Sequence, residues 1–192
     1  MPNIDILDNP TLDFFKKNYE DKNIPCLIKN YPLDWEIFKM PEYHIAEKLN
    51  VRNFYRYLKR DCHYLLPDKD DVFYLKDYLI SNSALRNSYS IPHYFENAPF
   101  KPDGWKWLYW GPPSSSSKIH IDTMLSSAWN VVISGEKIWW FWFNNKTYHC
   151  TQQEKEIVFT PSNTEHAVCN ITSCLSITNN YLRDLEKIKC AT

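Results

Sequence analysis

The sequence predicts a mainly β domain, a sandwich or a barrel with flanking helices. Amphipathic helical patterns are confined to the first part of the chain, whereas short apolar runs bounded by turn residues follow one another from Trp105 onward. With 3 glycines against 12 prolines among 192 residues, the chain is not a flexible or low-complexity polymer. We therefore expect a single domain over residues 1–192, with an N-terminal elaboration over about 1–104 and a barrel core over about 105–182.

The composition argues against several classes of protein. The 22 Lys+Arg and 23 Asp+Glu residues give a net charge of -1, so nucleic-acid binding is not indicated. No apolar run approaches the length of a membrane span, and the first residues do not form a secretory signal. We therefore expect an intracellular protein, cytoplasmic or nuclear, without a membrane partner. The 6 cysteines include no CxxC pair, which favours reduced, buried thiols.

The first part of the chain is predicted to contain two helices and one or two strands. Residues 11–20 and 41–58 are predicted helices because apolar residues of each segment can share one face of a helix. The residues expected to face the core are Leu12, Phe15 and Tyr19 in the first helix and Ile45, Leu49 and Tyr55 in the second. Thr11 or Asp8 could cap the first helix. Residues 24–28 form an apolar strand, residues 71–79 fit a strand or a short helix, and residues 92–102 form a loop.

From Trp105 onward the chain is predicted to be a series of strands. An aromatic strand at 105–110 ends at Gly111, and a serine-rich loop at 114–117 follows it. The segment 127–143 is predicted to be a β-hairpin that turns at Gly135 and Glu136. The remaining strands are expected at 119–123, 156–160, 167–170 and 174–181.

His120 and Asp122 give the first indication of chemistry. Side chains two apart in a strand point to the same face, so the imidazole and the carboxylate would project side by side. With a second histidine, for which His166 is the candidate, they would form a facial triad that suits Fe(II) and leaves coordination positions open. The His–Asp pair alone is also consistent with two polar residues on an exposed strand, which is the more frequent situation.

Polar residues on two further strands indicate a binding site for an anion. If the hairpin turns at Gly135 and Glu136, Asn130 and Lys137 face the same interior among aromatic residues. A buried lysine is unfavourable unless an anion meets it, and a dicarboxylate would supply that anion. Alternatively, Lys137 reaches the surface at the end of the hairpin. The last strand carries Ser176, Thr178 and Asn180 on one face, which is either a solvated stripe or a set of donors inside a barrel.

Together these residues resemble the JmjC family of Fe(II)- and 2-oxoglutarate-dependent oxygenases of the cupin superfamily. The similarity is greatest to the branch of the lysyl hydroxylase formerly called the phosphatidylserine receptor, and it covers about 12–182. The stretches that carry it are Trp107-Leu108-Tyr109-Trp110-Gly111-Pro112-Pro113, His120-Ile121-Asp122, Ser127-Ala128-Trp129-Asn130, Gly135-Glu136-Lys137-Ile138-Trp139, Val158-Phe159-Thr160-Pro161 with His166 and Asn170, and Ile177-Thr178-Asn179-Asn180. The fold implied is a double-stranded β-helix, a jelly roll.

The resemblance also implies a role for each candidate residue. Iron would be bound by His120, Asp122 and His166. Lys137, helped by Thr178, would pair with the distal carboxylate of 2-oxoglutarate, and the residues lining the co-substrate site would be Asn130, Asn180 and Tyr74. The implied reaction uses molecular oxygen, converts 2-oxoglutarate to succinate and CO₂, and hydroxylates a side chain of a protein, with lysine as the first candidate.

Other functions remain open at this point. The same chemistry could remove an N-methyl group from lysine or arginine, or the chain could be a non-catalytic JmjC-like binding module. The resemblance leaves the substrate and the oligomeric state undetermined. Seven of the 8 tryptophans lie between Trp105 and Trp142. Strand parity assigns Trp139 to the interior and Trp129, Trp140 and Trp142 to the opposite face, so we expect most of this cluster to pack between barrel and helices.

Overall fold

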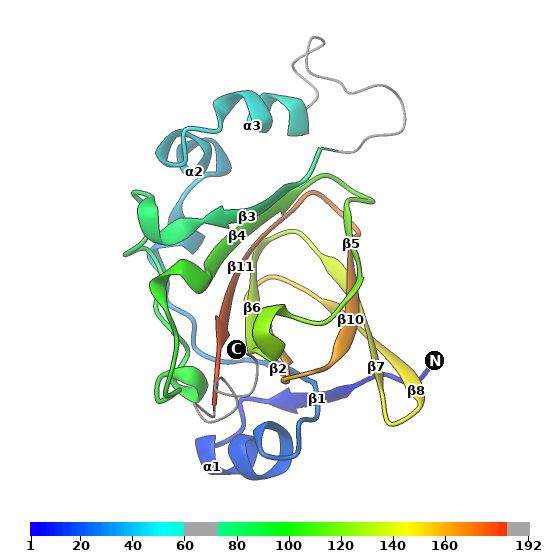
Figure 1. Ribbon diagram of the computed structural model, residues 1–192. Coiled ribbons are helices and arrows are strands. Elements are labelled where there is room, and N and C mark those ends of the chain that lie inside the picture. Colours follow the sequence, from blue (N-terminus) through cyan, green and yellow to red (C-terminus); the bar gives the residue numbers. More distant parts are fainter. Residues whose placement is uncertain (60–72, 184–192) are drawn as a thin grey trace.

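Two β-sheets form the body of the protein. The computed structural model describes residues 1–59 and 73–183 (Figure 1). The larger sheet has seven strands in the order β1-β2-β9-β6-β11-β4-β3, and the smaller sheet has four in the order β5-β10-β7-β8. The strands are β1 Asp5–Asp8, β2 Cys26–Lys29, β3 Leu75–Leu79, β4 Lys106–Gly111, β5 Ser116–His120, β6 Ser127–Ser134, β7 Lys137–Phe143, β8 Lys146–Gln152, β9 Ile157–Thr160, β10 Glu165–Asn170 and β11 Cys174–Tyr181. This mostly β, two-sheet architecture confirms the predicted jelly-roll class.

Helical segments lie mainly in the N-terminal part. The α-helices are α1 Leu12–Phe15, α2 Glu42–Lys48 and α3 Arg52–Leu58, and a π-helical turn, Lys16–Glu20, continues α1. Short 3-10 helices cover Glu36–Lys39, Ile80–Asn82, His93–Phe95, Asp103–Trp105 and Thr123–Leu125. Thr11 caps α1 as predicted, because its side-chain oxygen accepts a hydrogen bond from the backbone N–H of Phe14 at 3.3 Å. The described residues contain no helix long and apolar enough to cross a membrane.

The predicted helix over 41–58 is in fact two helices. It is interrupted between Lys48 and Arg52, where Asn50 adopts a left-handed φ of 59°. Asparagine tolerates this conformation better than most residues, so the chain can turn there. Ile45 and Leu49 are buried as predicted, and Tyr55 is partly buried against the same core.

Two hydrophobic cores lie on opposite faces of the larger sheet. The larger core joins the sheet to the helical segments, and Trp129 packs there against Trp35 and Phe95. The smaller core lies between the two sheets and includes Ile4, Leu27, Trp139, Phe141, Cys150, Val158 and Val168. Figure 1 shows α2 and α3 beside β3, and a hydrogen bond of 2.9 Å from the Tyr78 hydroxyl in β3 to the Leu49 carbonyl connects these parts.

The predicted hairpin over 127–143 is wrong. Strands β6 and β7 begin and end as expected, but β6 pairs with β9 and β11, whereas β7 pairs with β10 and β8. Gly135 and Glu136 therefore carry the chain from one sheet to the other. A two-residue link has the same sequence pattern whether it closes a hairpin or connects two sheets, because the choice of partner strand depends on contacts distant in the chain.

Some other strands were misplaced or missed. The strand predicted at 119–123 ends at His120, and its first residues, Ser116 and Ser117, fall in the predicted serine-rich loop. The strands β1 and β8 were not predicted; both are edge strands with many polar residues. The segment predicted at 71–79 is a strand over Leu75–Leu79, and its first two residues lie outside the described residues.

Candidate metal centre and co-substrate pocket

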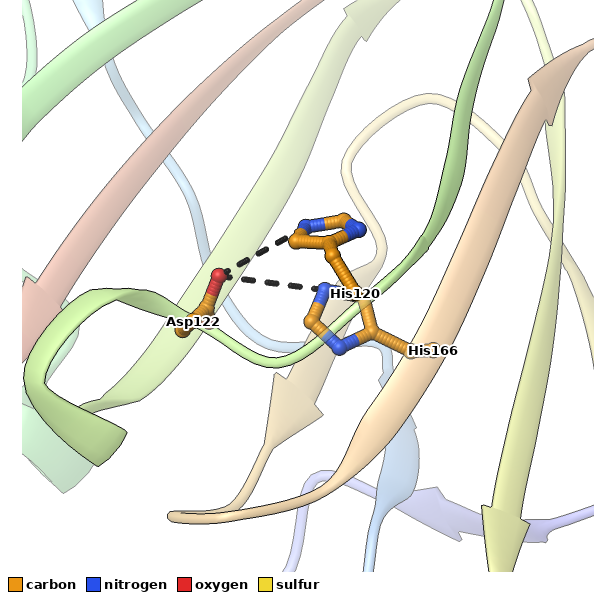
Figure 2. Close-up of side chains that lie close together, drawn as sticks. All are labelled: His120, Asp122 and His166. Atoms are coloured by element: carbon orange, nitrogen blue, oxygen red, sulfur yellow. Dashed lines mark ion pairs between the residues drawn. The ribbon is translucent and has the colours of Figure 1, made fainter.

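His120, Asp122 and His166 come together at one end of the space between the sheets. His120 at the end of β5 stands opposite His166 in β10, and Asp122 follows β5 in an extended conformation. Figure 2 shows the three side chains converging. The Asp122 Oδ1 atom lies 3.8 Å from His120 Nε2 and 3.9 Å from His166 Nε2. One atom from each residue could bind a metal ion, because these atoms all lie within 4.8 Å of one another.

The outer nitrogen of each imidazole is held by the backbone. His120 Nδ1 lies 2.7 Å from the Lys118 carbonyl, and His166 Nδ1 lies 3.0 Å from the Thr164 carbonyl. A neutral histidine that donates from Nδ1 has a lone pair on Nε2, which is the atom that faces Asp122. Burial lowers the pKa of His166 and favours this neutral form, although the nearby carboxylate of Asp122 opposes the effect.

The carboxylate of Asp122 also fits a cation. Its Oδ2 atom is buried and has no hydrogen-bond partner among the described residues. A buried carboxylate oxygen without a partner is unfavourable unless a cation neutralises it. Two imidazole nitrogens and one carboxylate oxygen on one side of an open space suit Fe(II), because they leave other coordination positions free. The residues present therefore fit the metal that the sequence predicts.

Lys137 is a buried cation at the start of β7. Its side chain is 2% exposed, and its Nζ atom donates a hydrogen bond of 2.6 Å to the Ser176 hydroxyl. No carboxylate of the described chain lies within ion-pair distance of it. Burial accordingly lowers the pKa of Lys137. A lysine in this situation is well suited to bind the carboxylate of a ligand.

The Ser176 hydroxyl that accepts from Lys137 belongs to a polar network of β6 and β11. The side-chain amide of Asn130 donates to the Thr178 hydroxyl at 2.7 Å and to the Ser176 hydroxyl at 3.2 Å. The amide of Asn180 donates to the Ser126 hydroxyl at 2.8 Å. The predicted polar stripe of β11 thus faces the space between the sheets. Asn130 and Lys137 do share this interior, although they reach it from two sheets and not across a hairpin.

All the predicted site residues line one cavity of about 680 Å³. They are His120, Asp122, His166, Lys137, Thr178, Asn130, Asn180 and Tyr74. Their roles stay predictions, but their convergence is a property of the fold. Other lining residues were not predicted to belong to the site, among them Trp107 and Tyr109 in β4 and Lys76 and Asp77 in β3. Alternation in the aromatic strand could have indicated Trp107 and Tyr109, because both lie on one face of β4.

The tryptophans divide only in part as predicted. Trp139 lines the cavity and stacks on the ring of His166 with a centroid distance of 5.9 Å. Trp110 and Trp129 belong to the larger core. The expectation that the others also pack against helices is wrong for Trp140 and Trp142, which alternate with the interior residues of β7 and belong to neither core.

Comparison with known proteins supports the resemblance. The family described as JmjC domain, hydroxylase, matches residues 143–181. The bifunctional arginine demethylase and lysyl-hydroxylase psr-1 of Caenorhabditis elegans is 24% identical over 91% of this chain and 59% of its own length. The arginine-specific demethylase JMJ22 of Arabidopsis thaliana is 29% identical over 51% of this chain and 28% of its own.

A further relative is named for both cofactors. The 2-oxoglutarate and iron-dependent oxygenase JMJD4 of Mus musculus is 23% identical over 90% of this chain and 49% of its own length. The chain therefore spans between 28% and 59% of the length of these three relatives. These matches confirm the predicted resemblance to JmjC oxygenases, and the names of the relatives agree with the predicted cofactors, iron and 2-oxoglutarate.

Proposed function

We propose that this chain, as a JmjC-type protein, is an Fe(II)- and 2-oxoglutarate-dependent oxygenase that hydroxylates a side chain of a protein. The observation that carries the proposal is the joint presence, in one cavity, of a His–Asp–His ligand set and a buried lysine without an acidic partner in the described chain. Either feature alone is also compatible with a purely structural role. A metal site beside an unneutralised cation is the arrangement that a metal-chelating dicarboxylate requires.

His120, Asp122 and His166 would hold the metal through two Nε2 atoms and a carboxylate oxygen. Bound iron would supply the activation of molecular oxygen that couples decarboxylation of 2-oxoglutarate to succinate and CO₂ with oxidation of a C–H bond. The contacts of Lys118 and Thr164 with the two Nδ1 atoms would keep both rings oriented before the metal binds.

The polar residues of the same cavity would bind the co-substrate. The ammonium of Lys137 would pair with the distal carboxylate of 2-oxoglutarate, so that the two buried charges neutralise each other. The Thr178 hydroxyl would contribute a neutral donor, and Asn130 and Asn180 would line the site. The rings of Trp139 and Phe141, which stack at an interplanar angle of 3°, would keep water away on one side.

The substrate is proposed to be a protein, with lysine as the first candidate residue. The cavity is compatible with a side chain as the reacting group, because Trp107 and Tyr109 line it together with the triad. N-methyl demethylation is the second candidate, and the names of two relatives favour it. The two reactions share every residue proposed here, because they differ only in which C–H bond of the substrate lies near the metal.

The proposal predicts turnover and a product. Purified protein given Fe(II), oxygen and 2-oxoglutarate should form succinate, and His120→Ala should not. Proteins from cells with wild type or His120→Ala should then be compared by mass spectrometry: hydroxylation adds about 16 Da, whereas removal of a methyl group subtracts about 14 Da. Absence of both succinate and 2-oxoglutarate binding in the wild type would leave a non-catalytic binding module as the better description.

A further inference from the structure

Strand β3 contains a bulge where it lines the cavity. The residue pairs on either side of the bulge belong to the larger core or pack against it: Leu75 with Trp110, and Tyr78 with Leu108. Between these pairs β3 has two residues, whereas β4 has one. In a regular strand only one residue between two core-facing residues would point to the opposite face. The extra residue of a bulge breaks this alternation and re-aims a side chain.

The two residues of the bulge, Lys76 and Asp77, both line the cavity that contains the His–Asp–His set. Asp77 has a left-handed φ of 53°. Residues other than glycine rarely adopt this conformation, although aspartate and asparagine tolerate it better than most. Sparsely populated backbone conformations are concentrated at functional sites. The bulge thus adds an exposed carboxylate to the wall of the cavity.

Tyr109, the residue of β4 opposite the bulge, fixes this carboxylate. Its hydroxyl donates a hydrogen bond of 2.7 Å to Asp77 Oδ1. Burial, together with this hydrogen bond, raises the pKa of Tyr109, so the hydroxyl keeps the proton that it donates. A carboxylate has more acceptor positions than one donor can fill, so Asp77 can accept from a second group.

No cation of the described chain lies within ion-pair distance of Asp77. The adjacent Lys76 is held elsewhere, because its Nζ atom donates a hydrogen bond of 2.6 Å to the Ser116 carbonyl in β5. The other carboxylate among the described residues that line the cavity belongs to Asp122, which the proposed metal would neutralise. Asp77 is therefore the acidic group of this wall that remains for a substrate.

We propose that Asp77 is the counter-charge for a cationic side chain of the substrate, and that it selects lysine over neutral residues. This inference rests on the proposed function. The rings of Trp107 and Tyr109, which lie on one face of β4, would flank the methylene groups of that side chain. Tyr109 is a positioning residue, since it acts on the charge through Asp77. Lys118, which lines the cavity from β5, would favour an acidic side chain instead, and that preference is an outcome of the test.

The test is a competition between peptides that differ in one charge. Three pools of peptides have lysine, norleucine or glutamate at a fixed central position between random flanking residues. Norleucine has the lysine chain without its ammonium group. Protein with Fe(II), 2-oxoglutarate and oxygen is given an equimolar mixture, and mass spectrometry of the oxygenated products gives the ratios of kcat/KM. The wild type should prefer lysine to norleucine about 5-fold, as expected for one partly exposed ion pair.

Asp77→Asn separates charge from structure. Asparagine can still accept from Tyr109 and tolerates a left-handed φ, but it carries no charge. The preference for lysine over norleucine should disappear in this variant, whereas loss of a purely structural contact would slow all pools by the same factor. Asp13→Asn, at an exposed position of α1, is the matched control and should keep the wild-type preference. A preference that persists in Asp77→Asn, or a wild type that does not prefer lysine, overturns the proposal.

Two further outcomes are also decisive. Tyr109→Phe should lower the preference for lysine about 2-fold, because Asp77 is then less well oriented. If Asp77→Asn does not fold, an unchanged preference in Tyr109→Phe overturns the proposal. A wild type that binds 2-oxoglutarate but oxygenates no lysine peptide overturns this inference alone, whereas a wild type that does not bind 2-oxoglutarate overturns the proposed function.

Discussion

The burial of Lys137 destabilises the protein when no ligand is bound. Its charge lies in the interior, with one hydroxyl as its hydrogen-bond partner and no carboxylate of the described chain nearby. Such a group lowers the free energy of unfolding, since an unpaired buried charge is costly. This destabilising charge lies where the carboxylate of the proposed co-substrate would neutralise it. Such local instability is common at binding sites.

We expect Lys137→Met to stabilise the ligand-free protein while it abolishes 2-oxoglutarate binding. The free energy of unfolding, measured with urea at neutral pH, should rise by about 1–3 kcal/mol. Burial lowers the folded-state pKa of Lys137, so the unfolded chain binds more protons in the range between the folded pKa and the ordinary value of 10.5. Stability of the wild type therefore rises with pH through that range, and the advantage of Lys137→Met should shrink.

The matched control is Lys48→Met, at an exposed position of α2. This change should alter the free energy of unfolding by less than about 0.5 kcal/mol at either pH. A Lys137→Met protein that is less stable than the wild type at neutral pH would contradict the view that this lysine is uncompensated.

Among the elements, the two-residue link between β6 and β7 places the strictest requirements on backbone conformation and packing. Gly135 has a φ of 87°, and a Cβ atom there would lie 2.8 Å from Thr172 Oγ1 and 2.9 Å from Cys174 Cα. Glu136 is also fixed, because its N–H donates to Thr172 Oγ1 at 2.9 Å and its carbonyl accepts from Ile171 N at 2.9 Å. The crossing from one sheet to the other thus packs directly on the turn between β10 and β11.

Gly135→Ala should therefore destabilise the fold by about 2–4 kcal/mol, from a left-handed φ together with overpacking. Equilibrium urea unfolding measures the change. Gly104→Ala is the control, since nothing lies within 4 Å of a Cβ atom built there and its φ is not in the left-handed region. Equal stability of the two variants would show that the crossing tolerates a side chain.

This link also shows which elements could be predicted from the sequence. The bounds of β6, β7 and β11 follow from local alternation and turn residues, and they were predicted within a residue or two. The assignment of β6 and β7 to different sheets could not be predicted from a local pattern, because strand pairing is decided by distant contacts. Strand β8 was missed because it is an edge strand with many polar residues, so its sequence shows little alternation between apolar and polar residues.

The site was more predictable than the topology. His120, Asp122 and His166 could be selected by chemistry and resemblance, and Lys137 by the cost of burying a lysine. The close approach of Gly111, Ser115 and Asn170 beside Tyr74 could not be predicted, because small polar residues and glycines occur at many turns. It depends on the three-dimensional arrangement of β4, β10 and the start of β3, which are distant in the chain.

At the scale of the whole molecule, we propose that the N-terminal part and the barrel form one domain. The N-terminal part supplies β1, β2 and β3 to the larger sheet, and its helices cover one face of that sheet. Unfolding should therefore be a single transition, with far-UV circular dichroism and tryptophan fluorescence coinciding in urea. Two separated transitions would contradict a single domain.

Metal binding should stabilise the whole fold, because a ligand that binds only the native state raises the melting temperature. Excess Mn(II) with 2-oxoglutarate should raise it by about 5 °C or more. Asp122→Asn should lose most of this shift, since it removes the anionic ligand, whereas Asp13→Asn at an exposed position of α1 should keep it. An equal shift in Asp122→Asn would mean that the metal binds elsewhere.

The most direct test of the central claim is the binding of 2-oxoglutarate under anaerobic conditions, with and without Fe(II). The account predicts one molecule bound per chain in the presence of Fe(II), and much weaker binding when Fe(II) is left out, when His120 is replaced by alanine or when Lys137 is replaced by methionine. Binding that is unaffected by all three changes, or no binding by the wild type with Fe(II), would contradict it.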